Sequence, residues 1–273
     1  MTLIIAAASF TAGLLGALTG LGGGVVIVPL LTLVFGVDIR YAIGASLVSV
    51  IATSSGAASA YVKEGYSNIR IGMFLEIATT IGAIFGAYLA GITPTNIIAI
   101  IFGVVLLYSA VLTFITRFQK HLNNKNDKIA GILRLNGNYP TQNGLQNYSV
   151  QNVPQGFGLM FIAGSLSGLL GIGSGAAKVL AMDQVMKIPF KVSTTTSNFM
   201  IGVTAAASAG IYLSRGYIDP GLSMPVMLGV LLGALVGAKV LTKARTYWLK
   251  ILFSIVIFFL AFEMIKNGIS GRI

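Results

Sequence analysis

The stretch FTAGLLGALTGLGGG at residues 10–24 returns as FIAGSLSGLLGIGSG at residues 161–175, 151 positions later. A shift by this distance aligns the two ends of the chain without a gap over roughly 90 residues, at about one fifth identity. The glycine pattern is kept, since the glycines of the first cluster align with those of the second. Self-similarity of this length predicts a fold made of two related halves.

The composition indicates that both halves lie in a membrane. Of the 273 residues, 55% are hydrophobic and 9% are charged, whereas soluble domains carry about 25% charged residues. Each half contains five apolar segments, of which the last three are about 20 residues long and can span a bilayer. The first two are shorter and are joined at the glycine clusters. We therefore predict an all-α integral membrane protein, each half having a Gly-linked pair of short helices plus three full transmembrane helices.

The number of crossings predicts how the halves are oriented. Whether the short pair crosses the membrane or turns back, each half makes an odd number of net crossings. The halves then form inverted repeats, as in many secondary transporters whose binding sites lie at the repeat interface. The predicted parts are an N-terminal membrane repeat at 1–116, a polar linker at 117–154 and a C-terminal membrane repeat at 155–273.

The distribution of lysine and arginine predicts the topology. Cytoplasmic loops of membrane proteins carry an excess of basic residues, and the linker holds Arg117, Lys120, Lys125, Lys128 and Arg134. A cytoplasmic linker in the cytoplasmic membrane leaves both termini outside, with lipid around the helices. The net charge of +11 then reflects topology, and it gives no reason to expect nucleic acid as a partner. Because the linker is rich in Asn, Gln and Gly, we expect it to be a mobile connection.

The two glycine clusters are the strongest candidates for a binding site. Each begins a short apolar segment, so a helix starting there directs unpaired N–H groups toward the cluster. Such groups can bind an anion, and glycine allows the ligand to approach the backbone. A tight turn without a ligand is the alternative. The candidate residues are Gly22, Gly23, Gly24, Gly173, Ser174 and Gly175.

Two ionisable side chains lie inside apolar segments, where charge is costly and indicates function. Lys178 follows Gly175 by three residues and can supply a positive charge to an oxyanion. The alternatives are a lysine that extends to water or one that pairs with Asp183. Glu76 lies about two turns into a spanning segment and can bind a coupling proton or form a structural ion pair.

Hydroxyl and amide side chains add possible ligands for the same anion. Ser46 aligns with Ser197 across the repeat, and Asn198 follows Ser197. These groups can donate hydrogen bonds to the oxygen atoms of an oxyanion. The alternative is hydrogen bonding between helices, which is common for Ser and Thr in lipid.

Several classes of function are excluded or unsupported. The chain has no cysteine and one histidine, His121, so we expect no metal and no cofactor. The motifs H-E-x-x-H, G-x-S-x-G and G-x-x-x-x-G-K-[ST] do not occur, so we expect neither an enzyme nor an ATP-driven pump.

At its glycine motifs the chain resembles the sulfite exporter TauE/SafE family. The residues that carry the resemblance are Gly13-Leu14-Leu15-Gly16, Gly20-Leu21-Gly22-Gly23-Gly24, Pro29 and Ala45-Ser46-Leu47, with Ser167-Gly168-Leu169-Leu170-Gly171-Ile172-Gly173-Ser174-Gly175 in the second half. The resemblance implies secondary transport of small sulfur-containing anions such as sulfite, sulfoacetate or related sulfonates. Ser174 replaces a central glycine of the family pattern, and the linker is longer than is usual in the family.

We therefore expect a secondary transporter that moves a small sulfur-containing anion by alternating access. An anion channel using the same residues is the alternative. The small-residue ladders, such as Gly82 with Gly86 and Gly229 with Gly233 and Gly237, suit close helix packing, and they can also support a homodimer.

Overall fold

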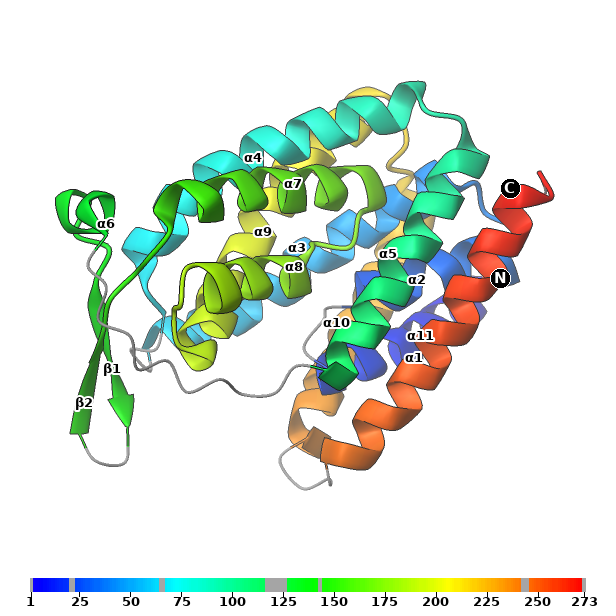
Figure 1. Ribbon diagram of the computed structural model, residues 1–273. Helices are drawn as coiled ribbons and strands as arrows, with labels where there is room; N and C mark the ends of the chain where they lie inside the picture. The colour runs from blue at the N-terminus through cyan, green and yellow to red at the C-terminus, as the bar shows by residue number, and fades with distance from the viewer. Residues whose placement is uncertain are drawn as a thin grey trace.

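The computed structural model describes residues 2–19, 23–63, 67–115, 127–141, 144–241 and 246–271. The chain is almost entirely helical (Figure 1), as the composition predicted. The elements are α1 (Thr2–Thr19), α2 (Gly24–Pro29), η1 (Leu30–Val34), α3 (Ile39–Lys63), α4 (Ile69–Ile92), α5 (Thr95–Ile115), α6 (Lys128–Ile132), β1 (Gly137–Thr141), β2 (Gly144–Tyr148), α7 (Val153–Leu170), α8 (Gly175–Leu180), η2 (Ala181–Val185), α9 (Phe190–Ser214), α10 (Pro220–Leu241) and α11 (Thr246–Ile269).

The elements begin and end at equivalent positions in the two halves. A shift of 151 residues relates α2 to α8, and the π-helical turn η1 to η2. Pro29 precedes η1 and has no N–H to donate, but Leu180 stands at the equivalent position and the helix widens there as well. The widened turn therefore belongs to the fold, and proline only accommodates it.

Glycines allow the helices of one half to approach those of the other at backbone distance. α1 packs on α10, and α7 packs on α4. A Cβ on Gly13 would collide with the carbonyl of Val230, and a Cβ on Gly164 would collide with the carbonyl of Thr79. These two contacts are related by the same shift of 151 residues. Gly82 and Gly86, and Gly229 and Gly233, are likewise packed against backbone within the chain.

The remaining long helices pair with their own equivalents. α3 packs on α9 in the middle of the molecule, and α5 packs on α11 at one side (Figure 1). α4 also packs on α9, and α10 on α3. The helices that carry the predicted site residues Ser46 and Ser197 therefore cross in the interior.

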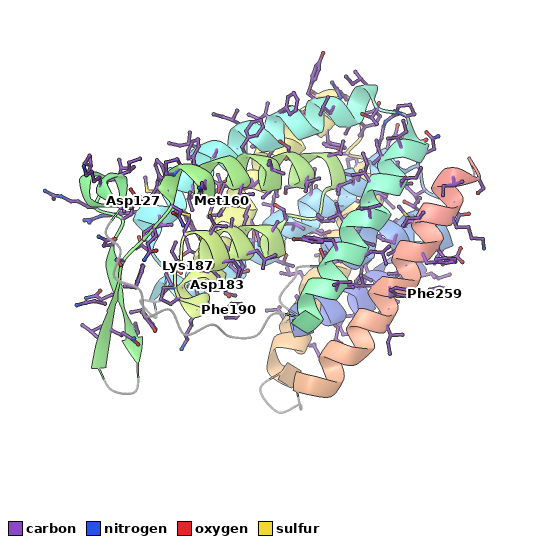
Figure 2. The ribbon with its side chains drawn as sticks, viewed as in Figure 1. Asp127, Met160, Asp183, Lys187, Phe190 and Phe259 are labelled. Carbon is purple, nitrogen blue, oxygen red and sulfur yellow. The ribbon has the colours of Figure 1, made fainter. Side chains whose placement is uncertain are left out.

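The outer surface of the bundle is apolar. Phe259 of α11 projects outward (Figure 2), together with large side chains of α4, α10 and α11 that remain exposed, among them Met73, Ile77, Ile81, Leu228, Leu232, Leu235, Ile255, Phe258 and Phe262. By length and composition, two of the helices described are sufficient to cross a membrane, namely Ile69–Ile92 and Val153–Leu170. Within the glycine-linked pairs, α1 and α7 each span 18 residues, whereas α2 and α8 span six each.

The linker differs from its prediction. Residues 127–154 hold α6 and a hairpin in which β1 pairs with β2 antiparallel, so the expected mobile connection is wrong for this part of the chain. Ala130, Leu135 and Val150 are buried beside Met160 and Met186. These few apolar residues form a small core in a largely polar segment. The average composition of the segment did not predict this core, because so few residues make it.

Asn68, at the start of α4, joins this small module to the bundle. Its Nδ2 donates to the Tyr148 hydroxyl at 2.7 Å, and its backbone N–H donates to Thr196 Oγ1 of α9 at 3.0 Å. Burial raises the pKa of the Tyr148 phenol above its ordinary value, so the hydroxyl stays neutral and keeps its proton. Asp127 accepts from the N–H groups of Ile129 and Val153 and so caps both α6 and α7.

Candidate functional site

The second glycine cluster forms the turn between α7 and α8. Gly171 and Gly173 have φ values of +67° and +69°, in the left-handed region that glycine adopts without steric cost. Ser174 has φ of +44°, which is uncommon for a residue with a side chain. The chain therefore reverses here through backbone conformations that explain the predicted need for glycine.

The first half of the chain holds this turn in place. Ser46 Oγ of α3 donates a buried hydrogen bond of 2.8 Å to the Gly171 carbonyl. A Cβ on Gly24 would lie 2.9 Å from the same oxygen and 2.7 Å from Ser46 Oγ. Residues of the two glycine clusters, far apart in the sequence, therefore meet at Ser46.

The equivalent serine on α9 contacts α8, within the second half of the chain. Ser197 Oγ donates to the Gly175 carbonyl at 3.3 Å. A Cβ on Gly173 would lie 3.0 Å from Ile201 and 3.3 Å from Val50, which are equivalent positions on α9 and α3. Both serine hydroxyls thus donate to backbone carbonyls here, and Ile201 and Val50 lie against the second turn at Gly173.

The other predicted site residues are placed less centrally. Gly22 lies outside the described residues. Gly23 faces Val230 of α10, because its Cβ would lie 2.8 Å from Val230 Cγ1. Asn198 is half-buried and follows Ser197 on α9, so its side chain points about 100° away around the helix. Ser174 Oγ is buried and has no hydrogen-bond partner among the described residues.

Lys178 and Glu76 are brought together by a residue that the sequence did not single out. The Lys178 side chain is completely buried, and its Nζ donates to Thr204 Oγ1 at 2.5 Å. Thr204 Oγ1 in turn donates to Glu76 Oε1 at 2.7 Å. The ammonium therefore lies no farther from the carboxylate than the sum of these two distances. This network of Lys178, Thr204 and Glu76 joins α8, α9 and α4.

The network resolves the alternatives for Lys178. Its side chain does not extend to water, because none of it is exposed. Asp183 accepts a hydrogen bond from Gln184 Nε2 at 2.7 Å, and the hydrogen bond of Lys178 goes instead to Thr204. A buried charge requires a countercharge, and Glu76 supplies it.

Glu76 is only partly satisfied. Oε1 accepts from Thr204, and also from Thr80 Oγ1 at 3.2 Å on the same helix. Oε2 is buried, and among the described residues it has no partner. A buried carboxylate oxygen without a donor is costly, so this atom marks a place where a proton or a ligand would be stabilising.

Two features of the sequence pointed to Thr204 as a possible site residue. It is the repeat equivalent of Thr53, and it lies seven residues after Ser197. Seven residues are about two helical turns, which puts both side chains on one face of α9. Repeat equivalence alone did not separate Thr204 from the many hydroxyl residues around it.

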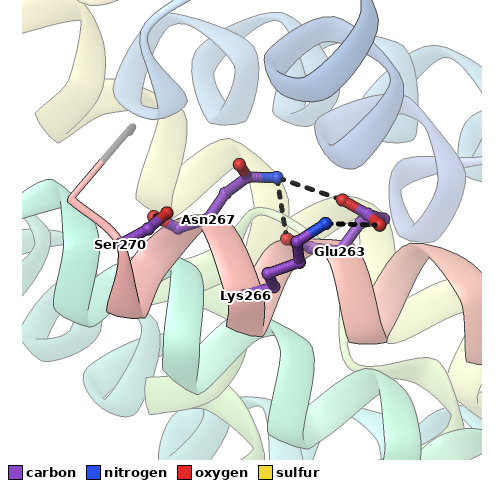
Figure 3. A network of polar contacts seen from close by, with 4 residues as sticks. All are labelled: Glu263, Lys266, Asn267 and Ser270. Carbon is purple, nitrogen blue, oxygen red and sulfur yellow. Dashed lines mark hydrogen bonds and ion pairs between the residues drawn. The ribbon is translucent and has the colours of Figure 1, made fainter.

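A second carboxylate–ammonium pair provides a contrast. Glu263 and Lys266 near the end of α11 lie 3.5 Å apart (Figure 3), and their side chains are 27% and 58% exposed. A pair open to its surroundings contributes little and needs no functional explanation. The buried pair differs in burial, and in joining three separate elements.

Within the ranges that the structure describes, no three His, Asp or Glu side chains converge as a metal site requires. The chemistry of the site therefore rests on one ammonium, one carboxylate, hydroxyl groups and backbone turns.

Comparisons with known proteins agree with the motifs. The family model "Sulfite exporter TauE/SafE" matches residues 5–264. The probable membrane transporter protein YunE of Bacillus subtilis is 27% identical over 97% of this chain and 98% of its own length. The probable membrane transporter protein YdhB of the same organism is 29% identical over 83% and 85%. MJ0441 of Methanocaldococcus jannaschii, also a probable membrane transporter, is 25% identical over 77% and 72%. No solved structure matches the chain.

Proposed function

Because the chain belongs to the sulfite exporter TauE/SafE family of multi-pass membrane transporters, we propose that it is a secondary transporter of a small sulfur-containing anion. Sulfite, sulfoacetate or a related sulfonate is the substrate. The two halves form inverted repeats, and the anion crosses the cytoplasmic membrane as they rearrange around a central site.

The observation that carries this proposal is the buried ammonium of Lys178. An ammonium has three N–H donors, and Thr204 is its one hydrogen-bond acceptor among the described residues. A buried cation with unused donors is suited to an oxyanion, which accepts several hydrogen bonds and brings an opposite charge.

The glycine turns provide the rest of the site. Ile201, which lies against Gly173 and Gly175, precedes Thr204 by one helical turn. The hydrogen-bond partner of the Lys178 ammonium therefore lies one helical turn along α9 from the side chain that contacts the second cluster. The unpartnered hydroxyl of Ser174 is a further donor, and Ser46 and Ser197 become donors if the anion displaces their carbonyl acceptors.

The orientation in the membrane is part of the proposal. The linker faces the cytoplasm, and both termini lie outside, in agreement with the excess of basic residues in the linker. Because the chain contains no cysteine, single substitutions give clean probes. A membrane-impermeant maleimide should label Ser270→Cys on intact cells, and should label Asn138→Cys only after permeabilisation. The reverse pattern would overturn the orientation.

The substrate is tested by thermal stability of detergent-purified protein with sulfite, thiosulfate, sulfoacetate, taurine, sulfate, acetate and chloride. A ligand that binds the folded state raises Tm by mass action. We expect a sulfur oxyanion to stabilise the wild type and the control Lys266→Met, but not Lys178→Met. If no sulfur anion raises the wild-type Tm, the substrate assignment is wrong.

The transport mechanism is tested in proteoliposomes. A carrier exchanges labelled external anion for unlabelled internal anion, whereas a channel carries ionic current and shows no such counterflow. We expect counterflow of labelled sulfite without a measurable single-channel current. A current without counterflow would favour the anion channel.

A further inference from the structure

In the network of Lys178, Thr204 and Glu76, binding of an anion to Lys178 changes the net charge around Glu76 and so favours binding of a proton there. Without substrate, the ammonium and the carboxylate neutralise each other inside the protein. When a monovalent anion pairs with the ammonium of Lys178, the carboxylate of Glu76 becomes a buried charge without a countercharge. Such a charge is costly enough that the group binds a proton instead.

Thr204 can follow this change without moving its backbone. Its hydroxyl has one proton and faces two acceptors, Glu76 Oε1 at 2.7 Å and the Met200 carbonyl at 2.9 Å. It donates to Glu76 when the carboxylate is ionised. When Glu76 is protonated at Oε1, its own O–H can donate to Thr204, and the threonine proton turns to the Met200 carbonyl. Both protonation states of Glu76 are thus hydrogen-bonded.

Glu76 also offers a free position for the proton. Oε2 is buried and unpartnered among the described residues, while Oε1 already accepts from two threonines. A proton on Oε2, as the alternative to one on Oε1, removes the cost of an ionised oxygen without a donor; Thr204 then need not switch, and the hydrogen bonds from Thr204 and Thr80 stay in place.

α4 itself carries Arg70 and Tyr88, six and twelve residues from Glu76, and the surrounding elements bring few other ionisable groups. α7, which packs on α4, contains none. α9 contains Lys191 and Tyr212, which lie 13 and 8 residues from Thr204 along the helix, and the Tyr212 hydroxyl donates to the Gly168 carbonyl. Besides Lys178, α8 and η2 contribute Asp183, which accepts from Gln184. Glu76 is therefore the group whose countercharge the anion removes.

We propose that Glu76 is a proton-binding site linked to the anion site through Lys178 and Thr204, so that one proton accompanies each monovalent anion. The proton comes from water on the side to which the site is open and returns to water on the other side. By reciprocity, protonation of Glu76 frees Lys178 and strengthens anion binding by the same factor. This inference rests on the proposed transport function.

The test uses purified full-length protein in proteoliposomes, with the membrane potential held at zero by potassium and valinomycin. The probes are labelled sulfite and labelled methanesulfonate, which carries one negative charge at every pH used. With the outside one pH unit more acidic than the inside, one proton per anion predicts about tenfold accumulation of methanesulfonate. Counterflow without a pH gradient is measured in the same vesicles.

The variants separate coupling from transport. Glu263→Gln, which alters the exposed pair of α11, should accumulate both probes as the wild type does. Glu76→Gln should retain measurable counterflow of both probes but show an internal-to-external ratio of methanesulfonate near one under the gradient. The wild type also tests the inference by itself, through internal acidification of one proton per methanesulfonate reported by a trapped pH dye.

The outcomes are distinct. Wild-type counterflow without accumulation or acidification overturns the proton site and leaves the transport function standing. Accumulation of methanesulfonate by Glu76→Gln shows that the proton travels elsewhere in the protein and also overturns it; accumulation of sulfite alone reflects the proton that hydrogen sulfite itself carries. Absence of counterflow for both probes in the wild type overturns the transport function, and the proton site with it.

Discussion

Ile27 and Lys178 occupy equivalent positions in the two halves, and both side chains are fully buried. Around them the backbone is alike, since each lies one turn into a short helix that widens into a π-helical turn. Ile27 contributes packing to the core formed with α3 and α10. Lys178 places a charge at the same depth.

The neighbouring positions differ in the same way. Thr53, the equivalent of Thr204, donates to the carbonyls of Ser49 and Val50 on its own helix. Thr204 also reaches another helix, where it donates to Glu76. The position equivalent to Glu76 is Met227. The two halves therefore share a packing scaffold, while Glu76 of the first half and Lys178 of the second have apolar residues, Met227 and Ile27, at their equivalent positions.

Substitutions at the equivalent positions Lys178 and Ile27 should show the largest difference between the halves in Tm and in counterflow. Lys178→Met leaves Glu76 without a countercharge, and loss of one partner of a buried pair costs about 3–5 kcal/mol. We expect sulfite counterflow to be lost and Tm to fall. Ile27→Met conserves volume and should cost less than about 1.5 kcal/mol. Equal effects of the two substitutions on counterflow and Tm would contradict the asymmetry.

The glycine contacts should behave alike in the two halves. Gly13→Ala and Gly164→Ala each place a Cβ against backbone of the facing helix, and overpacking costs about 1–3 kcal/mol. Gly158→Ala on α7 meets nothing within 4 Å and should be neutral or slightly stabilising. Thermal unfolding in detergent measures all three. A harmless substitution at either Gly13 or Gly164 would show that the scaffold is not shared.

The two serines allow a finer comparison. Ser46→Ala removes a 2.8 Å hydrogen bond between the halves, and Ser197→Ala removes one of 3.3 Å within the second half. A buried hydrogen bond contributes about 0.5–1.5 kcal/mol, and we expect Ser46→Ala to lie at the upper end. A larger fall in Tm for Ser197→Ala would reverse this ranking.

The linker module has no counterpart within either half, and a substitution in it should have the smallest effect on Tm and on counterflow. Tyr148→Phe removes the hydrogen bond from Asn68 and should cost about 1 kcal/mol or less. Sulfite counterflow should remain at the wild-type level. Loss of counterflow in this variant would show that the module acts on transport, and that the comparison of the two halves is incomplete.

The sequence by itself determined the helices, the repeat and the glycine turns. Long apolar segments form helices in lipid because the backbone must satisfy its own hydrogen bonds, and glycine is needed where φ is positive or two backbones touch. These requirements are local, so the residues of each segment are enough to predict them. For the same reason Lys178 and Glu76 stood out as charges inside apolar segments.

Only the tertiary structure decided what those charges face. Glu76 and Thr204 are 128 residues apart, and no periodicity within a segment indicates that α4 and α9 bring them to one hydroxyl. The linker gives the same lesson, since Ala130, Leu135 and Val150 form a core only once the hairpin brings them beside α7. Contacts between distant segments depend on how whole helices pack. The sequence indicates such packing only at positions that recur in both halves, such as the glycines.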